Sequence, residues 1–229
     1  FVTNPEAVLP LGSCGIPLNK IATVAHGQWD MLLAQKECNN ADFYHHLYKF
    51  GVVSDVLKRK SAEYKITSRV PDVVPFGIHF DVFYRKPSDR LQKIGYGGAR
   101  ATQNFFGMEI KRAHLVSGVV EKTPLELVNH NFYNWMCMPS YYAKLDALAA
   151  AGRLVLSTPV GYFEEHGPKG GGVVLPLADE EYCTSLFSNL AHYYNYPEEY
   201  KKKCNEIQEY ARENYDWSKY IEGWVNFLS

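Results

Sequence analysis

The sequence predicts an α/β protein with two lobes and parallel sheets. Short β-branched runs alternate with segments that have helix-forming composition, and the connections are long enough to cross between parallel strands. Glycine-rich turns follow several of the runs, as they do where ligands bind to open α/β sheets. With 229 residues and 46% hydrophobic content, the chain is large enough for a real core and for two lobes.

The first lobe is predicted from two strands and a helix. Asn19 to His26 has the composition of a buried strand, and the polar residues GQWD follow, so His26 lies at a strand exit. Tyr48 to Ser54 predicts a second, parallel strand. Ser54 is then placed to cap a helix that begins at Asp55.

The lobe boundary is predicted at Pro71 to Phe83, where two prolines and a glycine surround a short apolar run. This composition is typical of a strand that leads into a crossing between lobes. We therefore expect a partial first lobe at 1–75, a crossing at 76–88, a second lobe at 89–211 and a C-terminal helix at 212–229 that packs back toward the first lobe.

The second lobe is predicted to continue the alternation. We expect a strand at Arg90 to Tyr96 ending in the turn GYGG, a helix at Gln103 to Ala113 and a strand at His114 to Val120. Thr123 is expected to cap a helix with Pro124 and Glu126 in its first turn, and Trp135 to Met138 is expected to be a short strand.

The segment from Arg153 to Asp179 predicts two short buried strands joined by a loop with glycines and two carboxylates, Glu164 and Glu165. A helix from Tyr141 to Ala151 precedes it, and Gly152 stands where a glycine stop belongs. Such a loop suits a nucleotide site, and an ordinary surface turn is the alternative.

The end of the chain is predicted to be helical from Glu180 onward. Pro197 is expected to start a helix with acids first and lysines later. An amphipathic segment, Trp217 to Leu228, has a helical apolar stripe that must be buried and that can pack across the first lobe.

Composition and charge exclude several classes of partner and site. The formal net charge is −1, and no basic run exceeds Lys201 to Lys203, so nucleic acid is not expected as a partner. No apolar run approaches the length of a membrane span. The five cysteines are scattered without metal-ligand spacing, which favours free thiols in a reducing cytoplasm and no metal site.

Candidate chemistry gathers at the predicted strand ends. The N–H groups of the GYGG turn can approach a pyrophosphate, and Arg100 or the pair Lys111 and Arg112 can neutralise phosphate charge. Solvated surface charge is the alternative, more so for Arg112. His26 can contact a reacting group or be structural, and the glutamates can bind sugar hydroxyls, act as bases or form surface salt bridges. The GxSxG motif of hydrolases is absent.

Taken in order, the motifs resemble those of GT-B fold glycosyltransferases, in the large family-four group (group 1 glycosyltransferases). Coverage runs from about Ile21 to the end of the chain, and the order of the motifs is more telling than any one of them. The matching segments are ATVAHG, VVSDVLKR, VVPFGIHFDVF, KIGYGGAR, SGVV, MPSYY, LDALAAAG, STPVGYFEEHGPKGGGVVLPLAD and ARENYDWSKY. The resemblance implies two Rossmann-like lobes that bind a nucleoside-diphosphate sugar between them.

The resemblance also implies roles for single residues. It makes His26 the acceptor-lobe histidine near the reacting sugar carbon and Glu165 the glutamate of the donor loop. The remaining donor contacts that it implies are Gly97, Gly98, Arg100 and Lys111 for the diphosphate, Gly118 and Val119 beside the nucleobase, Asp146 for ribose or sugar, and Gly161 at the start of the donor loop.

The expected reaction moves a sugar from a UDP- or GDP-sugar to a hydroxyl of a glycan, lipid or protein, with retention and without a metal. The family's pair of glutamates eight residues apart is not intact, because Met138 replaces the first and Asp146 is one residue out of step. His26 also falls early, which implies an incomplete first lobe and a fragment, or a chain completed elsewhere. Two alternatives are a non-catalytic nucleotide-sugar-binding or partner subunit and a nucleotide-sugar epimerase.

Overall fold

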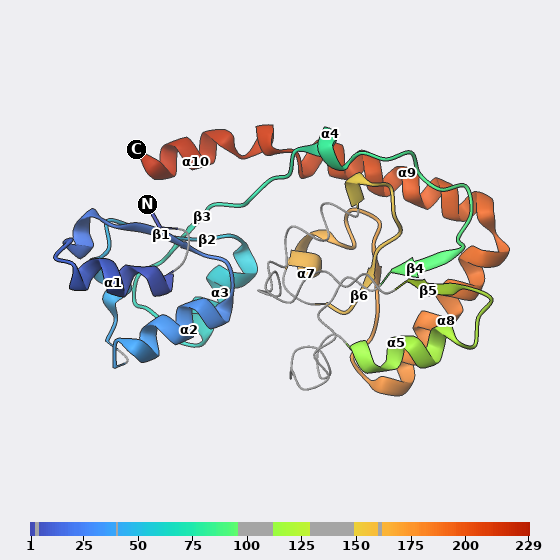
Figure 1. Ribbon diagram of the computed structural model, residues 1–229, viewed down its shortest axis with the longest axis horizontal. Helices are drawn as coiled ribbons and strands as arrows, with labels where there is room; N and C mark the ends of the chain where they lie inside the picture. The colour runs from blue at the N-terminus through green and yellow to red at the C-terminus, as the bar shows by residue number, and fades with distance from the viewer. Residues whose placement is uncertain (3–4, 40, 96–111, 129–148, 160–161) are drawn as a thin grey trace. The chain divides into compact units, whose positions relative to one another are not determined.

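The computed structural model describes residues 1–2, 5–39, 41–95, 112–128, 149–159 and 162–229. The chain divides into two compact units (Figure 1). The first unit comprises Phe1–Gly77 together with Trp217–Ser229, and the second comprises Ile78–Asp216. None of the helices in the described segments has both the length and the hydrophobicity that crossing a bilayer requires.

A parallel three-stranded sheet organises the first unit, in the order β1-β2-β3. β1 (Ala22–Ala25) pairs with β2 (Lys49–Val52), which pairs in turn with the short β3 (Asp72–Val73). All four residues of β1 are buried, as the composition of Asn19 to His26 predicted. The strands expected around these residues are therefore confirmed.

The helices α2 (Gln28–Glu37) and α3 (Asp55–Glu63) connect these strands and pack against them. Ser54 accepts a hydrogen bond from the backbone N–H of Leu57 over 3.2 Å, which confirms the predicted helix cap. Shorter helical turns complete the periphery of the unit: η1 (Pro5–Ala7), α1 (Val8–Ser13), η2 (Leu18–Lys20) and η3 (Phe43–His46).

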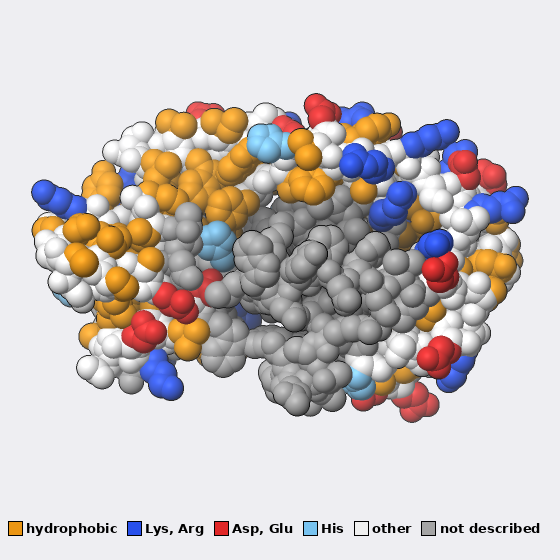
Figure 2. Space-filling model, in the orientation of Figure 1, with side chains coloured by type: hydrophobic (Ala, Val, Ile, Leu, Met, Phe, Trp, Pro, Cys, Tyr) orange, Lys and Arg blue, Asp and Glu red, His pale blue; other side chains and the backbone are white. Residues whose placement is uncertain are grey.

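The last helical segment of the chain belongs to the first unit. It consists of η6 (Trp217–Lys219) and α10 (Ile221–Leu228), and α10 covers the face of the sheet opposite α2 and α3 (Figure 1). Phe227 is 5% exposed and packs beside Gly51 of β2. Hydrophobic side chains also gather on the outer side of α10 (Figure 2), where Ile221 and Val225 are more than half exposed.

In the described part of the second unit, the strands form two parallel pairs. β4 (Lys93–Gly95) pairs with β5 (Glu126–Val128), and β6 (Leu156–Ser157) pairs with β7 (Val173–Val174). The helices described in this unit are α4 (Phe80–Phe83), α5 (Ala113–Val120), α7 (Tyr162–His166), α8 (Asp179–Asn195) and α9 (Pro197–Asn214). Pro197 occupies the first turn of α9, as expected from its position.

The strand predicted at His114 to Val120 is wrong, because this segment forms helix α5. Its three valines favour a strand by composition. Val116, Val119 and Val120, however, recur at helical spacing, and all three are buried in a core that includes residues of α8. This tertiary packing overrides the intrinsic preference of the β-branched residues.

The helix predicted after Thr123 is also wrong, because the segment Glu126–Val128 forms strand β5. The Thr123 hydroxyl donates to the carbonyl of Val120 over 2.7 Å and accepts from the N–H of Leu125 over 3.3 Å. The threonine therefore closes the end of α5 instead of opening a new helix, and the chain leaves this turn in an extended conformation.

Two other predicted elements cannot be compared with the structure. The strand at 135–138 lies entirely outside the described residues, and the helix at 103–113 lies almost wholly outside them. Of the helix predicted at Tyr141 to Ala151, only residues 149–151 are described: Ala149 and Ala150 are helical, and Ala151 lies in a turn. Gly152 follows with φ of +63°, which confirms the glycine stop. The loop expected between β6 and β7 contains a helix, α7, so Glu164 and Glu165 lie on helical backbone.

Candidate functional site

His26 lies directly after β1, at the strand exit where the sequence placed it. Its backbone N–H donates to Oδ2 of Asp30 over 3.3 Å. Asp30 stands in the first turn of α2 and is only 8% exposed. The buried carboxylate thus fixes the backbone of His26 between the strand and the helix.

The environment of Asp30 changes its ionisation. Burial raises the pKa of the Asp30 carboxyl, while the positive charge on His26 and the backbone N–H groups of His26 and Gly27 act in the opposite direction. Our sequence reasoning missed this residue, although a signal was present. An acidic residue three positions after the helix cap, here Gly27, is the spacing of a capping box.

The ring of His26 stacks on the ring of Phe76, with centroids 4.9 Å apart and planes 27° apart. Phe76 also stacks on Trp224 of α10, with centroids 5.0 Å apart and planes 29° apart. Trp217 contributes a further ring, 6.1 Å from Phe76. His26 therefore packs against a cluster of aromatic rings from two other stretches of the chain, the segment at Phe76 and the C-terminal helical segment.

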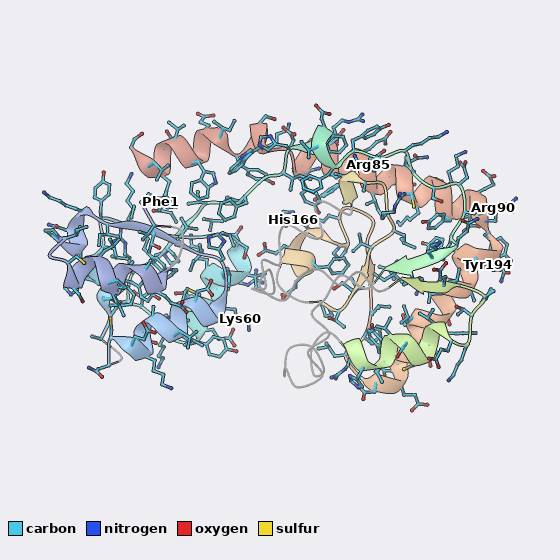
Figure 3. All side chains as sticks on the ribbon, in the orientation of Figure 1. Phe1, Lys60, Arg85, Arg90, His166 and Tyr194 are labelled. Atoms are coloured by element: carbon cyan, nitrogen blue, oxygen red, sulfur yellow. The ribbon has the colours of Figure 1, made fainter. Side chains whose placement is uncertain are left out.

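Glu165 lies in the second unit, on α7 after β6. Its side chain is 14% exposed, whereas Glu164 beside it is exposed. The neighbouring His166, labelled in Figure 3, places its Nε2 atom 3.8 Å from Oε2 of Glu165 and its ring against Tyr215. The sequence did not distinguish the two glutamates, but the structure does: the Glu165 side chain is largely buried and the Glu164 side chain is exposed.

The glycines after α7 have a structural role. The N–H groups of Gly167, Gly170 and Gly172 all donate to carbonyl oxygens within the segment Phe163–Gly172. A Cβ on Gly167 would lie 2.4 Å from the ring of Phe163, and one on Gly170 would lie 2.7 Å from the ring of Tyr210. Glycine is needed here for close packing, and these N–H groups are already used inside the turn. A small pocket beside this turn is lined by the three glycines and Tyr210, together with Ala149, Val155, Ile207 and Tyr215.

Arg112 is engaged in contacts within the second unit. Its Nε donates to the carbonyl of Leu177 over 2.6 Å and forms an ion pair with Asp179 over 2.9 Å. The side chain thereby connects the N-termini of α5 and α8. The solvated surface charge that the sequence offered as the alternative is wrong for Arg112, because its side chain is only 15% exposed and is paired with Asp179. Its contact with a phosphate stays a prediction.

Gly118 and Val119 lie on α5 and not on the strand from which their role beside a nucleobase was inferred. Gly118 is exposed, and a Cβ built on it meets nothing within 4 Å. Val119 is 4% exposed and contributes to the core. Their contact with a nucleobase stays a prediction, but its structural premise is wrong.

The other predicted donor contacts fall outside the described residues: Gly97, Gly98, Arg100, Lys111, Asp146 and Gly161. Some of them follow described strands closely in the sequence: β4 ends at Gly95, two residues before Gly97, and β6 ends at Ser157, four residues before Gly161. Within the part of the chain that is described, no group of three or more His, Cys, Asp or Glu side chains could hold a metal ion.

Among the solved structures that resemble the chain, two align with most of its length. Sucrose-phosphate synthase from Thermosynechococcus elongatus aligns with 90% of this chain and 66% of its own, at a TM-score of 0.56 and 11% identity. TarM aligns with 97% of this chain and 57% of its own, at a TM-score of 0.63 and 8% identity. Both are GT-B glycosyltransferases.

The chain has the GT-B fold. It spans less than two thirds of the length of either structure. No family model matches the sequence, and no curated protein matches it either. At such low identity the likeness shows the GT-B fold and leaves the activity of this chain to be inferred from its residues.

Proposed function

We propose that this GT-B chain takes part in glycosyl transfer from a nucleoside-diphosphate sugar to an acceptor hydroxyl. The observation that carries the proposal is the likeness to two GT-B glycosyltransferases over at least 90% of the chain. Two candidate residues support it, because His26 and Glu165 follow the carboxyl ends of parallel strands, where α/β folds bind ligands.

In this reaction the bond between the anomeric carbon and the diphosphate oxygen breaks, and a bond to the acceptor oxygen forms while the acceptor loses its proton. The departing diphosphate then carries negative charge that must be stabilised. We assign this stabilisation to Arg100, Lys111 and the backbone amides near Gly97 and Gly161. Such an arrangement requires no metal, and we propose that the anomeric configuration is retained.

The two described candidates receive separate roles. We propose that His26 hydrogen bonds to the sugar beside its reacting carbon, since an imidazole can donate and accept. We propose that Glu165 accepts hydrogen bonds from hydroxyls of the donor sugar. A carboxylate that is largely withdrawn from solvent forms stronger hydrogen bonds than an exposed one, which favours Glu165 over Glu164.

The first experiment measures thermal unfolding with and without UDP, GDP, ADP, dTDP and their common sugars. At about 100 times the dissociation constant, a ligand of the folded state adds roughly 2.7 kcal/mol to the free energy of unfolding. A selective rise in the melting temperature would identify the nucleotide. If no nucleotide or sugar changes the melting temperature, the proposed donor site is wrong.

The second experiment measures donor consumption with and without candidate acceptors. Glu165→Gln and His26→Ala should each lower kcat/KM for transfer by roughly 10-fold to 100-fold, the cost of a lost hydrogen bond to a charged or reacting group. Glu213→Gln and His46→Ala, at exposed positions, should leave it unchanged. Donor binding without transfer to any acceptor would instead indicate a binding subunit, and conversion of the donor without acceptor would indicate an epimerase.

A further inference from the structure

We infer that Phe76 is a positioning residue that fixes the ring plane of His26, and that Trp224 of the C-terminal helix holds Phe76 in place. The inference rests on the proposed function in one respect, the action of His26 at the reacting sugar. The stacked geometry itself belongs to the first unit and does not depend on that role.

The backbone and the ring of His26 are held by different groups. The carboxylate of Asp30 accepts the His26 backbone N–H, which fixes where the side chain begins. The stack on Phe76, at 27° between ring planes, restricts how the imidazole turns about its last bond. An imidazole that must present one nitrogen to a substrate needs both constraints, because small displacements of reacting groups lower the rate steeply.

Phe76 is in turn held by Trp224. The two rings stack with centroids 5.0 Å apart, and the indole N–H of Trp224 donates to the carbonyl of Pro75, the residue before Phe76, over 2.8 Å. No ring contact joins His26 to Trp224 within the described residues, so we place the two rings on opposite faces of Phe76. Phe76 therefore cannot turn without displacing one of them.

The consequence is a physical connection from the C-terminal helix to the candidate catalytic histidine. Both His26 and Phe76 are half-buried, so neither ring is needed to fill the central core of the sheet. A ring at position 76 that serves only to fill space could be replaced by leucine with little effect on His26. A ring that orients the imidazole could not.

The test replaces Phe76 by leucine in the full chain. Phe76→Leu should lower kcat for transfer by about 10-fold while leaving KM for the donor within twofold, since only the orientation of His26 changes. Phe76→Tyr keeps the ring and should restore kcat. Phe187→Leu, at a 41% exposed phenylalanine of α8, is the matched control and should have no effect.

A second readout does not depend on activity. In a chain labelled at histidine, the His26→Gln variant identifies the ring-proton NMR signals of His26. These signals should shift in Phe76→Leu, because the ring current of Phe76 is lost. The signals of the other seven histidines serve as internal controls. Trp224→Phe keeps a ring but loses the bond to Pro75, and should move the His26 signals by a smaller amount.

The outcomes separate the two ideas. Unchanged His26 signals in Phe76→Leu would overturn the positioning role whatever the activity. If the His26 signals shift but kcat is unchanged, the orientation that Phe76 gives to His26 does not matter for transfer. A wild-type chain that transfers no sugar would overturn the proposed function, while the NMR result would still decide whether Phe76 orients His26. Melting temperatures of all variants identify any that fail to fold.

Discussion

The indole N–H of Trp224 donates to the carbonyl oxygen of Pro75 over 2.8 Å, although 149 residues separate the two in the chain. Pro75 lies on the segment that leaves β3, and Trp224 lies on the last helix. The bond is one of several contacts that make the C-terminal helix part of the first unit. Removal of this helix would take Trp224 away and expose the face of Phe76 that Trp224 covers.

Gly77 lies close against the backbone of Trp217 in η6. A Cβ at this position would lie 2.5 Å from Cα of Trp217 and 2.7 Å from its backbone nitrogen. Because backbone atoms cannot move aside as a flexible side chain can, we expect Gly77→Ala to destabilise the first unit by about 1–3 kcal/mol. Urea unfolding monitored by tryptophan fluorescence measures this change.

The matched control for Gly77 is Gly223→Ala on α10. A Cβ there meets nothing within 4 Å, and glycine inside a helix costs about 0.5–1 kcal/mol relative to alanine. This variant should therefore be as stable as the wild type or more stable. Equal destabilisation of both variants would show that the approach of Trp217 to Gly77 is not what constrains position 77.

Asp30 should give the stability of the chain a defined pH dependence. Because burial raises its pKa above the ordinary value of 3.8, its contribution to stability is present below that value and is lost as the pH rises through the raised pKa. Asp30→Asn removes this titration. The free energy of unfolding of the wild type minus that of the variant should therefore fall as the pH rises through this window, and level off beyond it.

Chemical denaturation at a series of pH values measures this difference for Asp30→Asn. The control is Asp55→Asn, an exposed residue in the first turn of α3. A difference that rises with pH would mean that the hydrogen bonds from His26 and Gly27 outweigh the burial of the carboxylate.

The sequence predicted the elements whose signals are local. β1, β2, β6 and β7 are short apolar runs ended by polar residues or glycines, and the cap at Ser54 needs only neighbouring residues. α5 and β5 were exchanged because the composition of AHLVSGVV favours a strand, whereas its burial against the core at three positions makes it a helix. Burial on one face depends on distant residues, so composition alone could not show it.

In the candidate site, too, local features could be predicted from the sequence and contacts between distant residues could not. The position of His26 at a strand exit was predictable because it follows from the end of an apolar run. The stack on Phe76 and the support by Trp224 were not, since they join residues far apart in sequence. The choice between Glu164 and Glu165 also required the structure, because adjacent helical residues point in different directions and only one of them is withdrawn from solvent.

A substitution at Gly118 tests directly whether the segment Ala113–Val120 is a helix, as in the structure, or a strand, as the sequence predicted. On a helix, with its Cβ direction open to solvent, Gly118→Ala should raise the free energy of unfolding by about 0.5–1 kcal/mol. The same variant tests the expected contact with a nucleobase, since a methyl group beside the base would weaken nucleotide binding. Loss of affinity for the nucleotide found in the thermal screen would restore that role, and unchanged affinity would exclude it.

Gln208 connects three parts of the second unit. Its side-chain amide donates to the carbonyl of Arg85 over 2.8 Å and to the carbonyl of Ala150 over 2.7 Å, and the residue is only 7% exposed. Gln208→Leu removes both donors and leaves two carbonyl groups without them. We expect it to lower the free energy of unfolding by about 1–3 kcal/mol.

A second variant at this position, Gln208→Glu, makes the effect depend on pH. A protonated carboxyl can still donate one hydrogen bond to the carbonyls of Arg85 and Ala150, whereas a carboxylate is repelled by both. Burial and repulsion raise the pKa of the new carboxyl, so its stabilisation is present at acidic pH and is lost as the pH rises through that pKa. Urea unfolding at about pH 4.5 and pH 8 should show this loss, and Glu209→Gln, an exposed neighbour, should not reproduce it. Equal stability of Gln208→Glu at both values would mean that the two carbonyl groups find other donors when the amide is removed.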